Sequence, residues 1–303
     1  MRVACVGAAD IDRKLHLLSA VVPGSSNPAR AEEVVGGVAC NVARACAALG
    51  LETAMAGIVG RDAAGDRVLA ALAAAGVDTT LIARSADRPT ASYSAVLDPG
   101  GGLVVGVAVM GIHEELDEAW AERIGFRLAA CDTWVVDANP PAAVLRRLLE
   151  TRADDAFVAA DPVSAAKAAN LRPVLGLVDA LFPDAAEAAV LAGHPVAGPA
   201  DAARAAKAIR RLGPGVVVVT LGGEGIVVAD DAGTAHLAAI PPARVVDVTG
   251  AGDVMIAGYL LGRAQGEDAP LYGLAAASLA VESDESVPAG LTAAAVLRRL
   301  EER

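Results

Sequence analysis

The stretch 245–258 holds the residues with the clearest potential for chemistry, a Gly-Ala-Gly turn followed by an aspartate. The β-branched residues at its start predict the end of a strand, and the apolar pattern after Asp253 predicts a helix. Because glycine lets a backbone approach a ligand and a helix N-terminus attracts anions, we expect Gly250, Ala251 and Gly252 to form an anion site. Asp253 would lie at its mouth, where a phosphoryl group and a general base could meet. The alternative is a tight strand-to-helix turn with Asp253 facing the helix dipole.

A double glycine near the start of the chain marks a second candidate site. Gly36 and Gly37 precede a helix of small residues that Gly50 would end. Asn41 is a polar residue in the first turn of this otherwise apolar segment. It either makes a local cap or core hydrogen bond, or points into a ligand pocket, and the pattern leaves both open.

Two other segments carry weaker signals. Thr220, Gly222 and Gly225 follow a very apolar strand, so a nucleotide could lie against their backbone, although a plain turn has the same composition. Asp184 and Glu187 are three residues apart at a helix start and share one face. They could hold Mg²⁺ through water, but capping of the helix is favoured by the spacing alone.

Several common sites are missing from the sequence. There is no P-loop motif, and no Gly-x-Gly-x-x-Gly follows the first strand. The four histidines are scattered, without the spacing of a metal site. The four cysteines show neither zinc spacing nor a disulfide framework, so we expect free thiols.

The composition limits the classes of protein to which the chain can belong. With 303 residues and 54% hydrophobic content, one large domain with a sizeable core is the simplest expectation, covering residues 1–303. The net charge of −12 argues against a nucleic-acid polymer or an anionic membrane surface as a partner. No signal peptide and no apolar stretch of membrane-spanning length is found, so we expect a cytoplasmic protein without a membrane partner.

The predicted elements explain how these residues come together. From residue 115 to 221, strand patterns alternate with helical ones, which indicates an α/β fold with a mostly parallel sheet covered on both faces. Ligands bind such sheets at the carboxyl ends of the strands, where Asp12, Asn139 and Asp161 fall. A hairpin signature at 90–110 stands apart from this alternation and, with the short runs at 13–35, could form a small accessory sheet.

The motifs together resemble the two signatures of the ribokinase (PfkB-type) carbohydrate kinases. Gly36-Gly37 with Asn41 matches the first, and 247–253 matches the second. The remaining segments follow in family order, so the resemblance spans the chain. It implies a ribokinase-like three-layer fold, with 13–35 and 90–110 as a lid that covers the sugar and mediates a homodimer.

The resemblance also implies an activity, ATP-dependent phosphoryl transfer to a CH₂OH group of a sugar or nucleoside. Asp253 would be the general base, and the N–H groups of Gly250, Ala251 and Gly252 would hold the charge of the moving phosphoryl group. Intact catalytic residues speak against a silent nucleoside sensor. The other implied roles are substrate binding by Asp12, Gly36, Gly37, Asn41 and Asn139, nucleotide binding by Thr220, Gly222 and Gly225, Mg²⁺ binding near Asp184 and Glu187, and a K⁺ site at Asp247 and Thr249.

The chain departs from the family pattern at three positions. Asp184 replaces the usual Asn, Phe182 replaces a common Lys, and Asp10 replaces the usual Asn of the first turn. We expect Lys167 to supply, on the nucleotide side, the positive charge missing at Phe182. A second carboxylate at Asp10 would disfavour some substrates.

Overall fold

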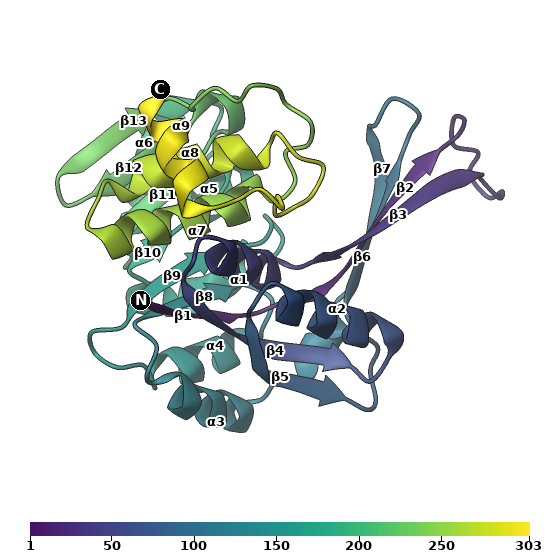
Figure 1. Ribbon diagram of the computed structural model, residues 1–303, viewed down its shortest axis with the longest axis horizontal. Coiled ribbons are helices and arrows are strands. Elements are labelled where there is room, and N and C mark those ends of the chain that lie inside the picture. The colour runs from purple at the N-terminus through teal and green to yellow at the C-terminus, as the bar shows by residue number, and fades with distance from the viewer.

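A nine-stranded sheet forms the centre of the molecule, seen in a computed structural model that describes all 303 residues. The strand order is β13-β12-β11-β10-β9-β8-β1-β4-β5, and all neighbours are parallel except the pairs made by β12 (Figure 1). The strands are β1 (Arg2–Val6), β4 (Glu52–Gly60), β5 (Asp78–Ser85), β8 (Thr133–Asp137), β9 (Phe157–Asp161), β10 (Ala180–Leu181), β11 (Val216–Thr220), β12 (Ile226–Asp230) and β13 (Gly233–Leu237).

Helices cover both faces of this sheet, which confirms the three-layer α/β prediction. Side chains alternate along each strand, so Val3 and Cys5 enter one apolar core while Ala4 and Val6 enter the other. The first core contains residues from α1 (Val38–Ala48), α2 (Ala63–Ala74), α7 (Ala251–Gln265), α8 (Ala269–Ala280) and α9 (Ala293–Glu301). The second contains residues from α3 (Glu118–Leu128), α4 (Ala142–Leu149), α5 (Ala185–Ala192) and α6 (Pro199–Arg210).

A separate four-stranded sheet projects from this body (Figure 1). Its order is β3-β2-β6-β7, with β2 (Asp10–Leu17), β3 (Ala29–Gly36), β6 (Ser92–Leu97) and β7 (Leu103–Val109). The register pairs Asp12 with Tyr93 and Lys14 with Ala95. Because side chains alternate across a strand, Asp10, Asp12 and Lys14 lie on one face of β2.

Two local expectations differ from the structure, and three elements were missed. The β-branched run Val245–Val248 forms an exposed loop and pairs with no strand. A helix expected at 164–175 is instead a 3₁₀ segment over Ala168–Leu177, which contains Pro173. Strand β5 and helices α8 and α9 were not anticipated.

The four cysteines are free and buried. None of the helices is both long and apolar enough to cross a membrane.

Candidate active site

The carboxyl group of Asp253 lies in the first turn of α7, against α1. Asn41 donates a hydrogen bond from Nδ2 to Asp253 Oδ2 at 2.8 Å, and both residues are buried. Asn41 is thus bonded to another candidate site residue, an arrangement that fits both a buried core amide and a residue of a ligand pocket. Burial raises the pKa of Asp253 to about 7, even though the hydrogen bond from Asn41 acts to lower it.

The N-terminus of α7 begins at Gly250, in a conformation that only glycine adopts easily. Its φ is +80°, and a Cβ here would lie 2.4 Å from the carbonyl oxygen of Ser286. No side chain caps the helix, and the N–H groups of Gly250, Gly252 and Asp253 have no backbone partner. The N–H of Ala251 differs from the expectation because it donates to Val248 O at 3.3 Å. The free N–H groups and the helix dipole make this end a suitable anion site.

The double glycine allows close packing on the side of the site that holds Asp12, Asn41 and Asn139, the acceptor side. A Cβ at Gly36 would lie 2.1 Å from Asp12 Oδ2, and one at Gly37 would lie 2.5 Å from the carbonyl oxygen of Ala8. Gly37 also has a φ of +92° as it enters α1. The Asp12 carboxylate can therefore lie directly on the backbone that leads into the helix of Asn41.

Asp137 organises this side of the site, and the sequence interpretation missed it. It is fully buried at the end of β8. Its Oδ2 accepts hydrogen bonds from the N–H groups of Ala8 at 2.8 Å and Ala39 at 3.2 Å, and its Oδ1 accepts from that of Asn139 at 2.9 Å. The one available signal was an acidic residue directly after the apolar run Trp134–Val136.

Lys167 lies on the acceptor side, which differs from the expectation that it serves the nucleotide side. Its Nζ donates to Asn139 Oδ1. Burial is the main cause that raises the pKa of Asp10, and the nearby charge of Asp12 adds to the rise. The positive charge of Lys167 opposes it. The loop after β9 thus directs Lys167 toward Asn139 and Asp10.

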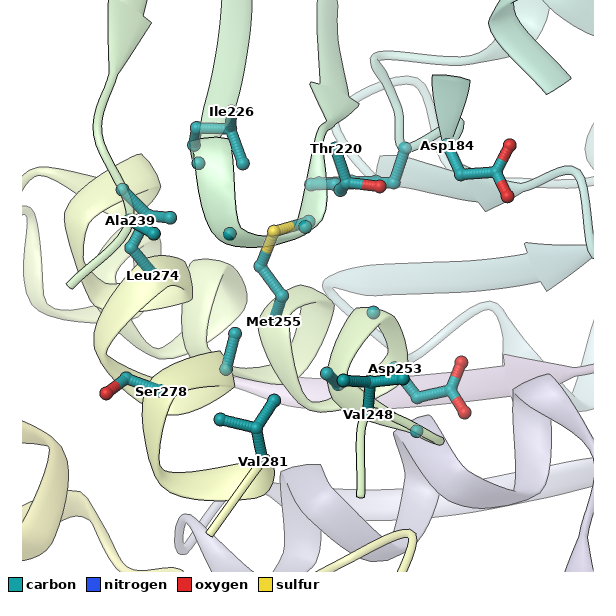
Figure 2. A pocket seen from close by; sticks show the side chains of 18 of the residues that line it. Asp184, Thr220, Ile226, Ala239, Val248, Asp253, Met255, Leu274, Ser278 and Val281 are labelled. Atoms are coloured by element: carbon teal, nitrogen blue, oxygen red, sulfur yellow. The ribbon is translucent and has the colours of Figure 1, made fainter. Parts of the chain in front are cut away.

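A cavity of about 520 Å³ opens beside the α7 N-terminus. Figure 2 shows Ile226, Ala239 and Leu274 along one side of it, while the carboxylates of Asp184 and Asp253 lie toward the other. The cavity size is that of a typical small-molecule site. Its lining includes the predicted residues Thr220, Gly222, Gly225, Asp184, Glu187, Gly250, Ala251, Gly252 and Asp253.

Asp184 and Glu187 form a capping box at the start of α5. Asp184 Oδ1 accepts from the N–H of Glu187, and Glu187 Oε2 accepts from the N–H of Asp184, both at 2.8 Å. This confirms the capping interpretation, and it leaves the second oxygen of each carboxylate free of these bonds. Burial raises the pKa of Glu187 to about 7. Phe182, which stands where the family commonly has Lys, packs edge-on against Tyr259, with ring centroids 5.0 Å apart.

The structure holds no group of three or more His, Cys, Asp or Glu side chains arranged to bind a metal by themselves. The free oxygens of Asp184 and Glu187 on the cavity wall suit Mg²⁺ bound mainly through water and phosphate oxygens. Asp247 and Thr249 lie outside this wall, and Asp247 Oδ2 accepts a hydrogen bond from Lys14.

Taken together, a buried carboxyl group with a pKa near neutrality, free backbone N–H groups and a nucleotide-sized cavity meet at one helix terminus. Such a site can deprotonate a hydroxyl group while stabilising the negative charge of a phosphoryl group.

Comparison with known proteins agrees with this chemistry. The family model described as pfkB family carbohydrate kinase matches residues 1–290. Pseudouridine kinase of Escherichia coli is 31% identical over 259 residues, covering 84% of this chain and 82% of that protein. A solved carbohydrate kinase from Agrobacterium tumefaciens is 34% identical with a TM-score of 0.84, covering 99% of this chain and 97% of that one. Arabidopsis thaliana ribokinase, solved with ribose and ATP, shares the fold at 23% identity and a TM-score of 0.88, covering 99% and 98%.

Proposed function

This chain belongs to the pfkB family of carbohydrate kinases, and we propose that it phosphorylates the 5′-hydroxyl of pseudouridine. As a member of this family it is an ATP-dependent phosphotransferase that acts on a hydroxyl group. The similarity to E. coli pseudouridine kinase supports the choice of nucleoside. Further support comes from the sequence at 26–28, 90–93 and 161–167, which resembles that enzyme.

The observation that carries the mechanism is the Asp253–Asn41 hydrogen bond beside the uncapped terminus of α7. Asp253 takes the proton of the 5′-hydroxyl as its oxygen attacks the γ-phosphorus of ATP. The bond from that phosphorus to the β,γ-bridging oxygen breaks, and ADP leaves. The N–H groups of Gly250 and Gly252 hold the charge that develops on the transferred group.

The two substrates approach Asp253 from different sides. ATP would lie in the cavity, with its base against the apolar side chains and its phosphates toward Gly222, Gly225 and α7. The ribose of the acceptor lies against Asp12, Asn41 and Asn139, which offer oxygens and an amide group for its hydroxyls. Asp184 and Glu187 would hold Mg²⁺, which neutralises phosphate charge when bound.

The four-stranded sheet acts as the lid of this site. It carries Asp12 on the face that β2 presents to the acceptor side. Closing it over the nucleoside excludes water from the α7 terminus, so ATP is not lost to hydrolysis.

The test is ADP formation with Mg²⁺ across pseudouridine, uridine, cytidine, adenosine, inosine, ribose and fructose at one concentration. We expect strong turnover of pseudouridine and little of uridine. Preferred turnover of ribose, a purine nucleoside or fructose would overturn the assignment of pseudouridine as substrate but leave the proposed mechanism in place. No turnover in the whole panel, with measurable nucleoside binding, would favour a sensor.

A further inference from the structure

A lysine of the four-stranded sheet reaches the loop that leads into α7. Lys14 lies on β2, and its ammonium group donates hydrogen bonds to Asp247 Oδ2 and, at 3.5 Å, to Thr249 Oγ1. The side chains of Lys14 and Asp247 are 27% and 25% exposed. An ion pair that is largely shielded from solvent is screened less by salt than one at the open surface.

Asp247 connects this ammonium group to the anion site. Its second oxygen, Oδ1, accepts hydrogen bonds from the N–H of Thr249 at 2.8 Å and from the hydroxyl of Thr249 at 2.7 Å. Thr249 directly precedes Gly250, where α7 begins. Burial raises the pKa of Asp247, but hydrogen bonds from Lys14 and Thr249 outweigh it and lower the pKa overall. The carboxylate therefore stays charged at neutral pH.

Lys14 also lies near the acceptor side of the site. Asp12 is two residues earlier on the same face of β2, and the charge of Lys14 opposes the rise that burial causes in the pKa of Asp12. One ammonium group thus lies between a carboxylate of the acceptor side and the loop that precedes the anion site.

A free monovalent cation does not fit Asp247 and Thr249 in this chain, although the family resemblance assigns them to a K⁺ site. The ammonium group engages one oxygen of Asp247, and Thr249 engages the other. A K⁺ ion at the same carboxylate would be repelled by the charge of Lys14. A tethered cation also has a high effective concentration at its partner, so a dissolved ion competes poorly with it.

We propose that Lys14 is the built-in cation of this site. It takes the place of a free monovalent ion, orders the loop 247–250 and couples the position of the four-stranded sheet to the anion site. The inference rests on the proposed kinase function. Lys14 acts as a positioning residue, because it contacts the loop and leaves the reacting groups to Asp253 and the α7 terminus.

The test compares cation dependence in wild type and Lys14→Met. At equal ionic strength, we expect wild-type kcat to be the same in potassium and choline chloride. Lys14→Met should lose about tenfold in kcat in choline, the scale of one charge-assisted hydrogen bond, and should regain activity with K⁺ or NH₄⁺. Lys14→Arg, which keeps the charge, should stay independent of K⁺. Lys207→Met, which removes an exposed lysine of α6, is the matched control and should behave as wild type.

Crystals soaked in a thallous salt give a readout that does not depend on turnover. We expect anomalous density for Tl⁺ beside Asp247 in Lys14→Met and none there in wild type. Tl⁺ beside Asp247 in wild type, K⁺ activation of wild type, or full K⁺-independent activity of Lys14→Met would each overturn the proposal. If no substrate of the panel is turned over, the proposed function fails while the thallium experiment still decides the role of Lys14.

Discussion

The burial of the Asp253 carboxyl group favours its role as a base but destabilises the folded protein when the group is ionised. Burial raises its pKa to about 7, the hydrogen bond from Asn41 lowers it, and the negative charges of Asp137 and Asp12 raise it again. A base with a pKa near neutrality combines a useful charged fraction with a strong affinity for the proton. The same burial makes its ionised form costly to the fold.

We expect kcat/KM to rise with pH up to about 7 and then to level off, because Asp253 must be ionised to accept the hydroxyl proton. Asn41→Ala removes the hydrogen bond that lowers this pKa, so its profile should be displaced to higher pH. The acceptor KM should rise as well, since Asn41 is proposed to bind the ribose. The measurement is a pH–rate profile with subsaturating pseudouridine and saturating ATP. Superimposable profiles for the two proteins would remove Asn41 from the control of the base.

Asp253→Asn should separate stability from activity. We expect kcat to fall by roughly 10² to 10⁴, the usual effect of losing a general base, with nucleoside binding largely kept. Because the folded-state pKa lies above that of an unfolded Asp, ionisation destabilises the wild type as pH rises from about 4 to 7. The neutral variant avoids this cost, so it should be more stable near pH 8 by up to about 4 kcal/mol, and by less near pH 5. Thermal or urea unfolding at both pH values measures the difference. A variant that is less stable at high pH, or as active as wild type, would contradict this account of Asp253.

Among the elements, the parallel sheet was the most predictable from the sequence. Strands such as β1, β8 and β11 are buried on both faces and give short apolar runs between helical patterns. Val245–Val248 has the same local composition but pairs with no strand, and pairing cannot be read from propensity. Helix α8 is mostly buried around its whole circumference, so it lacks the polar stripe that marks a surface helix.

The candidate site was predictable where one motif places both a helix and its ligand groups. Gly250, Gly252 and Asp253 share one helix terminus, so their proximity follows from the local sequence. The contacts of Asp137 with Ala8 and Ala39 join residues about a hundred positions apart and depend on the strand order. For the same reason, the sequence did not predict that Lys14 reaches Asp247, or that Lys167 faces Asn139.

The cap of α5 offers a prediction at this scale. Asp184→Ala should cost about 1 kcal/mol in the free energy of unfolding, because the N–H of Glu187 loses its acceptor. Asp184→Asn keeps that acceptor and should keep the stability. If the free carboxylate oxygen also holds Mg²⁺, both variants should need a few-fold more Mg²⁺ for half-maximal rate. Urea unfolding and Mg²⁺ titration of the rate provide the two readouts. An unchanged Mg²⁺ requirement in Asp184→Asn would leave this residue with a structural role alone.

On the scale of the whole molecule, the four-stranded sheet has an uncovered apolar side. Strand β7 is its edge strand, and Leu103, Val105, Val107 and Val109 are each about half exposed. Val105, Val107 and Val109 alternate along the strand and therefore share one face, whereas a register shift opposite Val96 and Leu97 takes Leu103 out of this alternation. Asp12 and Tyr93 belong to the opposite face, because the register pairs Ser94 with Val107. An exposed, apolar edge strand is a template for pairing with another chain.

We therefore expect a homodimer formed through the four-stranded sheets. The double variant Val105→Lys and Val107→Lys should be monomeric, because charge on this face opposes burial of one sheet against another. Light scattering after gel filtration gives the mass of each protein. Phe126→Lys is the control, since Phe126 is 85% exposed on α3, away from this sheet, and its variant should remain dimeric. If dimerisation holds the sheet over the acceptor, the monomeric variant should show a higher pseudouridine KM with an unchanged ATP KM. A wild type that is monomeric at assay concentration would instead mean that each lid closes over its own site without a partner.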